Sequence, residues 1–170
     1  LRALIDAGHR LAGHGWHHRA HCIKGLKHRL HSLLVSRDCA EHLALDRSGI
    51  VDLMTRNRQW FSDHDLPAPE LYVPPAWALG PVRAADLKAT GFARVETISG
   101  YLDIASGRFR RAALLGFEAA SAWQVPVLKI SNAFNRLLAR RLPLRVALHP
   151  NDHRLPLAAD LENTLTRYAH

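Results

Sequence analysis

Four of the twelve histidines stand close together in LAGHGWHHRAH, residues 11–21. His14 and His18 are four positions apart in this stretch. On a turn of helix that spacing directs two imidazole rings to one side, and neutral imidazole is a common zinc ligand. The pair is therefore a candidate metal site, with His17 pointing elsewhere and His21 reaching the site only if the loop folds back. A charged surface run is the alternative, because four crowded histidines give some pair at this spacing by chance.

A second candidate lies in LRVALHPNDH, residues 144–153, where an apolar run ends in His149 and Pro150 follows. Ligands of α/β proteins bind at the carboxyl ends of strands, so His149 is well placed for acid or base catalysis. Asp152 and Glu96 are the candidates for holding His149 in its cationic form. The alternative is a histidine that simply ends a strand.

The third candidate is LYVPPAW, residues 71–77, in which Pro74 and Pro75 stiffen the backbone after a strand. Trp77 offers a flat apolar face that suits a sugar ring or an acyl methyl group. Pro75 and Trp77 are therefore candidate substrate-binding residues. A rigid turn with a core tryptophan is the alternative.

A long amphipathic helix must precede the proline stretch. Asp46 or Ser48 can cap its start, and Pro67 and Pro69 end it. One face carries residues at helical spacing: Ile50, Leu53, Met54, Asn57, Trp60 and Phe61. That period is typical of core packing and not of a cofactor site.

The other elements alternate along the chain. We expect further helices at residues 1–8, 80–92 and 132–143, and strands at residues 9–15, 71–77, 93–103, 124–131 and 144–150. Short apolar strands that alternate with helices predict a parallel α/β sheet or barrel in a single domain, residues 1–170. Residues 17–39 lack clear periodicity, and long loops of that kind are often functional.

The composition limits the function classes. The chain has 170 residues, 48% hydrophobic and 22% charged, and no apolar run approaches the about 20 residues that a membrane helix needs. Two cysteines, Cys22 and Cys39, give no disulfide framework, which fits a cytoplasmic protein. The net charge of +8 invites a nucleic-acid hypothesis. However, the arginine clusters at residues 108–111 and 136–145 lack interleaved aromatics, which favours a solvated basic face.

Together, AGHGWHHRAH, LYVPPAW and LRVALHPNDH resemble, in that order and spacing, the motifs of the polysaccharide deacetylase superfamily with its NodB-homology fold, and of a little-characterised bacterial branch of it. His14 and His18 match the family's His-x-x-x-His metal motif. PPAW matches the end of its groove motif, and Leu148 and His149 match its Leu-His motif. The resemblance covers nearly the whole chain and implies a distorted (β/α) barrel, a divalent metal, in first place zinc, and a carbohydrate or other N-acetylated substrate.

Two departures accompany this resemblance. Val73 stands about where the groove motif of the family has an arginine, so whatever orients the catalytic base is different or missing. The family's Asp-Asp motif, which supplies the base and a third metal ligand, should precede residue 1, and Asp6 cannot replace it. The resemblance therefore implies an N-terminally truncated domain, an incomplete barrel without its first strands, which would also explain the absent initiator Met.

The activity that the resemblance implies is metal-dependent hydrolysis of a non-peptide C–N bond in an N-acyl amide. Zinc on His14 and His18 would lower the pKa of a bound water to about 7 and polarise the carbonyl group. A carboxylate would deprotonate that water, and His149 as imidazolium would protonate the departing amine. The alternatives are a catalytically dead deacetylase-like binding domain and, from a different class, a basic nucleic-acid-binding module.

Overall fold

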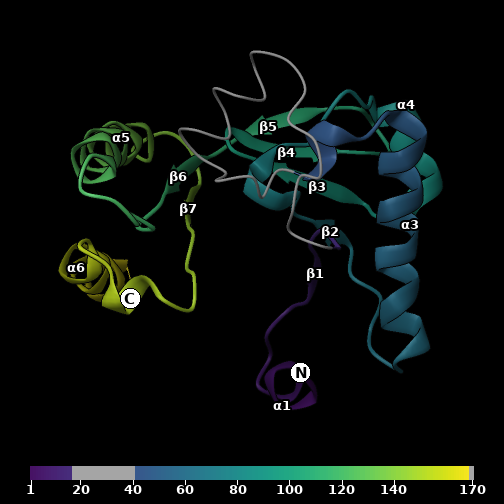
Figure 1. Cartoon of the computed structure of the whole chain (residues 1–170), viewed down its shortest axis with the longest axis horizontal. Coiled ribbons are helices and arrows are strands. Elements are labelled where there is room, and N and C mark those ends of the chain that lie inside the picture. Colours follow the sequence, from purple (N-terminus) through teal and green to yellow (C-terminus); the bar gives the residue numbers. More distant parts are fainter. Residues whose placement is uncertain (17–40, 169–170) are drawn as a thin grey trace. The chain divides into compact units, whose positions relative to one another are not determined.

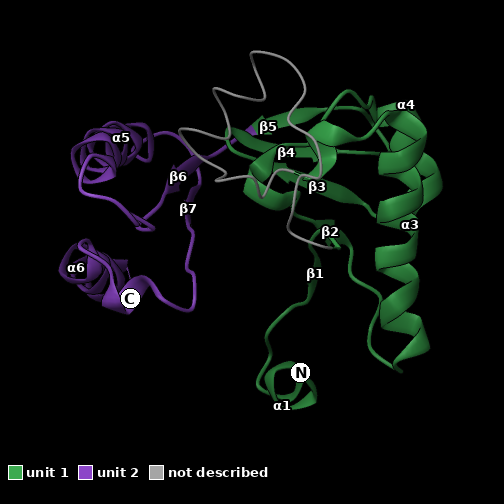
Figure 2. Ribbon diagram, viewed as in Figure 1, with its two compact units in different colours: residues 1–110 green, residues 111–170 purple. Residues whose placement is uncertain are grey.

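The computed structural model describes residues 1–16 and 41–168 of the chain. These residues form two compact units, unit 1 from Leu1 to Arg110 and unit 2 from Arg111 onward (Figures 1 and 2). The described part contains no helix with the length and apolar character that crossing a membrane requires. Each unit contains both helices and strands, which confirms the expected mixed α/β class.

Unit 1 is built on an open five-stranded sheet in the order β1-β2-β3-β4-β5. The strands are β1 (Ala12–Gly13), β2 (Leu71–Tyr72), β3 (Arg94–Thr97), β4 (Gly100–Asp103) and β5 (Phe109–Arg111). β1, β2 and β3 are parallel, as the alternation of helices and strands predicts, whereas β3 and β4 form an antiparallel pair. The described strands close no barrel, so the sheet ends at β1 on one side.

Helix α3 (Arg47–Asp63) covers the sheet of unit 1 (Figure 1). Asp46 caps its start by accepting a hydrogen bond from the Gly49 backbone N–H at 2.8 Å, which confirms one of the two expected caps. Its apolar face packs on strand residues Tyr72 and Val95 in one buried cluster. The cluster consists of Ile50, Leu53, Met54, Tyr72, Leu87, Phe92, Val95 and Ile104. The core interpretation of this helix face is therefore confirmed, with Trp60 only half-buried.

Short helices connect the other parts of unit 1. They are α1 (Arg2–Asp6), the 3₁₀ helix η2 (Glu41–Ala44), η3 (Pro75–Trp77), α4 (Ala84–Leu87) and η4 (Lys88–Thr90). Gly91 ends the last of these in the left-handed conformation, at φ +76°, which a side chain would disfavour.

Unit 2 consists of a parallel pair of strands with two helices. The elements are β6 (Ala113–Leu115), α5 (Gln124–Leu138), β7 (Leu144–Val146), the 3₁₀ helix η5 (Asp152–Arg154) and α6 (Ala158–Tyr168). Their core is a second buried cluster of Leu115, Phe117, Ala119, Leu157 and Leu161. A strand was expected at residues 144–150, and β7 forms its first part but ends at Val146. β6 and α6 were not predicted.

The strand expected at residues 124–131 is wrong, because this segment begins helix α5. Val125 and Leu128 pack against the core of unit 2, and the buried Asn132 follows four residues later on the same face. Residues spaced by three and four share one side of a helix, so the segment follows the helical period and not the alternation of a strand. Pro126 fits because it lies in the first turn, where a backbone N–H has no partner within the helix.

Two asparagine side chains of α5 form hydrogen bonds with backbone groups in β6 and directly after it, as a neighbouring strand would. The Asn132 side chain donates to the Gly116 carbonyl at 2.8 Å and accepts from the Gly116 N–H at 3.1 Å. The Asn135 Oδ1 atom accepts from the Leu114 N–H at 3.1 Å. Because unpaired backbone groups are costly to bury, these side chains allow the helix to lie against the strand.

Candidate functional site

His14 directly follows β1, and it is exposed. Its Nδ1 atom lies 2.7 Å from the Val73 carbonyl oxygen. A carbonyl oxygen only accepts, so Nδ1 carries the hydrogen and a neutral ring has its lone pair on Nε2. Metal-binding histidines commonly donate their other ring N–H to such a carbonyl, which orients the ring. Val73, the position at which the expected arginine is lacking, thus acts on His14 through its backbone.

The other proposed metal ligand, His18, lies outside the described residues, as do His17 and His21. In the described ranges 1–16 and 41–168, no three His, Cys, Asp or Glu side chains are grouped so that they could hold a metal ion. The His14–His18 pair therefore stays a prediction.

A buried series of hydrogen bonds begins at Gly15, the residue after His14. The Gly15 N–H donates to the Tyr72 hydroxyl oxygen at 3.1 Å. His42 Nδ1 lies 3.2 Å from the Leu79 carbonyl and therefore donates to it. This leaves His42 Nε2 as the acceptor for the Tyr72 hydroxyl hydrogen, across 2.7 Å. These hydrogen bonds connect the backbone next to His14 to β2 through Tyr72 and to η2 through His42.

Burial keeps this chain of hydrogen bonds uncharged. Burial lowers the pKa of His42, and this outweighs the hydrogen bond to Leu79 and the charge of Glu41, which both raise it. Burial also raises the pKa of the Tyr72 hydroxyl well above its usual range. His42 is therefore neutral near pH 7 and Tyr72 is protonated.

Glu41 lies next to this chain and connects η2 to the turn after β1. Glu41 is 5% exposed, and its carboxylate accepts a hydrogen bond from the Trp16 backbone N–H. Gly15, at φ +49°, leaves no room for a side chain between Glu41 and Pro75. The sequence reading missed both Glu41 and His42, because they adjoin a stretch without clear periodicity and no motif includes them.

The PPAW turn is packed and strained. Pro75 is buried against Gly15, so its side chain supports the turn from inside. Ala76 and Trp77 both have positive φ, +52° and +54°, which is uncommon for residues other than glycine. The Trp77 Nε1–H donates to Glu96 Oε1 at 3.0 Å, and this bond fixes the half-buried indole ring.

The register of the parallel strands brings these residues to one edge of the sheet. Gly13 pairs with Tyr72, and Tyr72 pairs with Val95. His14, Val73 and Glu96 each directly follow one of these paired residues. They therefore lie at or next to the carboxyl ends of neighbouring strands. Two of the three expected stretches meet at this edge, and it is the position at which α/β proteins bind ligands.

His149, in unit 2, follows β7 and is flanked by two carboxylates. Asp152 is 1% exposed, and its Oδ2 atom accepts from the His149 backbone N–H at 2.9 Å and lies 3.7 Å from His149 Nδ1. Glu118 Oε2 lies 3.5 Å from His149 Nε2. The structure thus brings the expected Asp152 to His149, whereas the alternative candidate, Glu96, bonds Trp77.

Glu118 is a neighbour of His149 that the sequence reading missed. It follows β6, and β6 and β7 are parallel, so the carboxyl ends of both strands lie on one side of their sheet. No sequence signal marks Glu118, because the element before it was not predicted.

Comparisons with protein-family models, with curated proteins and with solved structures find no match for this chain.

Proposed function

We propose that this protein is a metal-dependent hydrolase of an N-acyl amide bond, of the polysaccharide deacetylase type, with a fold of the NodB-homology kind. The observation that carries the proposal is His14. It stands at the carboxyl end of a parallel strand, in the stretch that resembles the family's metal motif, with Nδ1 on the Val73 carbonyl at 2.7 Å. The parallel arrangement of β1, β2 and β3 supports the same proposal for the fold.

The donor chemistry at His14 fits a divalent metal, in first place zinc. A ring whose Nδ1 is bonded to a carbonyl presents Nε2 as the ligand atom, and the buried chain behind it holds the adjoining Gly15 backbone in place. His14 and His18 would hold the ion. When bound, zinc lowers the pKa of a coordinated water to about 7 and polarises the amide carbonyl.

In this proposal His149 is the general acid. The protonated ring donates to the amine nitrogen as the C–N bond breaks, since an amine anion is a very poor leaving group. Asp152 acts as a positioning residue, because its buried carboxylate is fixed by the His149 backbone N–H and faces Nδ1. Both carboxylates lie at distances at which they pair with the ring once it is protonated.

Trp77 is proposed to contact the substrate. Its indole nitrogen is bonded to Glu96, so the ring is held at the same sheet edge as His14. An aromatic face held in this way suits a sugar ring or the methyl group of an acetyl group. Pro75 contributes indirectly, through the shape of the turn.

The metal site is tested by calorimetric titration of the protein with zinc. His14→Ala and His18→Ala should each weaken zinc binding by at least about tenfold, whereas His17→Ala should leave it unchanged. His17 is the matched control, because it lies in the same histidine-rich stretch. Equal losses at all three positions would show a loose histidine cluster and no defined site.

The catalytic role is tested in a version of the protein extended upstream to include the Asp-Asp pair that the resemblance implies. The measurement is acetate release from an N-acetylated chitooligosaccharide and from an activated acetate ester. His149→Ala should lower turnover of the amide by about 10² to 10⁴, the usual effect of a positioned proton donor. The ester should be affected less, because its leaving oxygen needs no proton. Zinc content should stay the same, and a loss of zinc would make His149 a ligand. Zinc and saccharide binding without acetate release would instead identify a deacetylase-like binding domain.

A further inference from the structure

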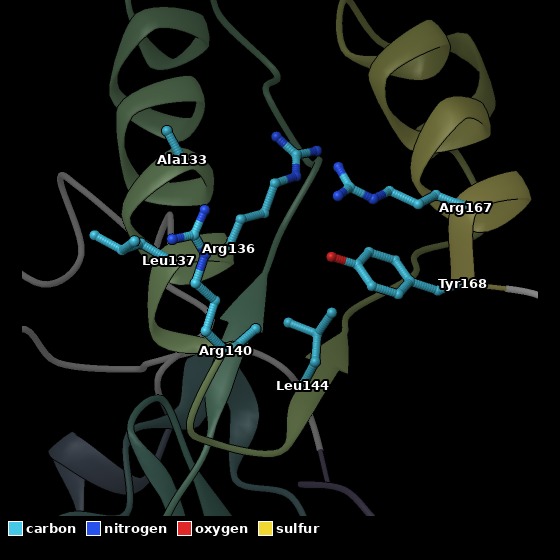
Figure 3. A pocket seen from close by; sticks show the side chains of 8 residues that line it. Ala133, Arg136, Leu137, Arg140, Leu144, Arg167 and Tyr168 are labelled. Atoms are coloured by element: carbon cyan, nitrogen blue, oxygen red, sulfur yellow. The ribbon is translucent and has the colours of Figure 1, made fainter.

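Unit 2 contains a pocket of about 400 Å³ that the proposed function does not use (Figure 3). Residues of α5, of the turn that follows α5, of β7 and of α6 line it. Its polar lining is formed by Arg136, Arg140, Arg167 and Tyr168, and its apolar lining includes Leu137 and Leu144. Three arginines therefore contribute to the lining of one small pocket.

Among the described residues, no carboxylate forms an ion pair with these three arginines. Figure 3 shows the guanidinium groups of Arg136 and Arg167 extending toward each other from facing helices, and the Tyr168 hydroxyl pointing into the space beside them. Like charges placed in this way repel, and a bound anion would offset that repulsion.

The fold holds two of these groups in place. Arg136 Nη2 donates to Thr164 Oγ1 at 2.9 Å, and Thr164 is itself buried on α6. The Arg167 guanidinium lies 5.8 Å from the centre of the Tyr168 ring, a cation–π contact. A partly fixed arginine loses less conformational freedom when it binds a ligand, which favours binding.

We propose that this pocket binds the phosphate group of a small phosphomonoester, with the apolar part of the ligand against Leu137 and Leu144. The planar guanidinium fork matches two phosphate oxygens, and a phosphate dianion balances several guanidinium charges better than a carboxylate does. The Tyr168 hydroxyl adds a further donor. The pocket is concave and small, which suits one phosphate group more than a long nucleic-acid backbone.

Phenyl phosphate and inorganic phosphate are the probes, titrated calorimetrically into the whole protein at constant ionic strength. Phenyl phosphate should bind more tightly than inorganic phosphate, because only the ester reaches the apolar lining. Arg167→Gln should weaken its binding by about ten- to a hundredfold, the effect of losing a charge-assisted contact. Arg167→Lys should recover only part of this affinity, because lysine keeps the charge but not the fork.

Arg141→Gln is the matched control. Arg141 is exposed, adjoins Arg140 and does not line the pocket, so the same loss of charge there should change the affinity less than twofold. Equal weakening by Arg141→Gln and Arg167→Gln would overturn the proposal in favour of general attraction to a basic surface. Absence of phenyl phosphate binding at millimolar concentration, or binding of oligonucleotides alone, would also overturn it. Circular dichroism melting of each variant confirms that it is folded.

Discussion

Tyr72 connects two groups of unit 1 through one hydroxyl, a backbone N–H and a ring nitrogen. It accepts from the Gly15 N–H, donates to His42 Nε2 and packs its ring in the core. Tyr72→Phe removes only the oxygen and leaves a buried N–H and a buried ring nitrogen without a partner. Such groups cost about 1–3 kcal/mol each, so we expect the free energy of unfolding to fall by about 2–6 kcal/mol.

Fluorescence-detected urea unfolding measures this loss for unit 1. Trp123 is the one tryptophan of unit 2, so a Trp123→Phe background limits the signal to Trp16, Trp60 and Trp77. Unchanged stability of Tyr72→Phe would show that the hydroxyl group has no structural role.

His42 should make the stability of unit 1 depend on pH. Its pKa is about 6.5 in the unfolded chain and lower in the folded one, because burial disfavours the charged ring. Between these two values the unfolded chain binds more protons, so the contribution of His42 is complete above about pH 6.5 and declines as the pH falls below it.

The comparison with His42→Gln isolates this effect, because glutamine does not titrate. At pH 7.5 the variant should be less stable than the wild type, since the bonds to Tyr72 and Leu79 are disturbed. The difference between the two should shrink at pH 5.5. The same difference at both pH values, measured by urea unfolding, would contradict the assigned shift of the His42 pKa.

At the scale of the elements, the sequence predicts those helices and strands whose apolar residues recur at a regular spacing. Helix α3 has both a cap, Asp46, and an apolar face, and the structure confirms both. Residues 124–131 carry several β-branched and apolar residues in a short run, which does not distinguish a strand from the buried face of a helix. The helical conformation of this segment is favoured by the packing of Val125 and Leu128 against the core of unit 2. A local sequence pattern does not contain this information.

The candidate functional residues follow the same division. His14, Trp77, His149 and Asp152 belong to short motifs, so the sequence alone marks them as candidates. Their partners come from elsewhere in the chain: the Val73 carbonyl reaches His14 across strand pairing, and Glu118 reaches His149 across the pairing of β6 with β7. Those neighbours follow from strand order and register, which one sequence does not reveal.

The contact of β1 with its neighbours depends on Gly13. A Cβ atom built there would lie 2.5 Å from Asn57 Oδ1, 2.7 Å from Phe92 Cζ and 2.8 Å from Tyr72 Cδ2. Gly13→Ala should therefore lower the free energy of unfolding of unit 1 by about 1–3 kcal/mol, the usual cost of overpacking.

Gly116→Ala is the control for this substitution, because a Cβ atom at Gly116 meets nothing within 4 Å. It should change the stability little, or raise it slightly by restricting the unfolded chain. If urea unfolding shows the same change in the free energy of unfolding for both substitutions, the close contact of β1 with α3 and the core is not required for stability.

At the scale of the whole molecule, a high positive charge coexists with an exposed apolar stripe. The net charge is +8, which opposes association of like molecules at low salt. From the N-cap of α5 onward, exposed large apolar side chains recur every three or four residues: Trp123, Val127, Ile130, Phe134 and Leu137. Exposed apolar surface of this kind promotes association, and salt removes the electrostatic opposition.

We therefore expect the protein to self-associate as sodium chloride rises from about 0.05 M to 0.5 M, a range over which charge screening shortens to a few ångströms. Ile130, 72% exposed, is the most accessible residue of the stripe, so Ile130→Glu should weaken this association severalfold in sedimentation velocity. Ser131→Glu is the matched control, because it adds the same charge one residue further along α5 without removing apolar surface. If both variants weaken association equally, charge and not the apolar stripe governs it. If the wild type stays monomeric at 0.5 M salt, the stripe promotes no association of this protein with itself.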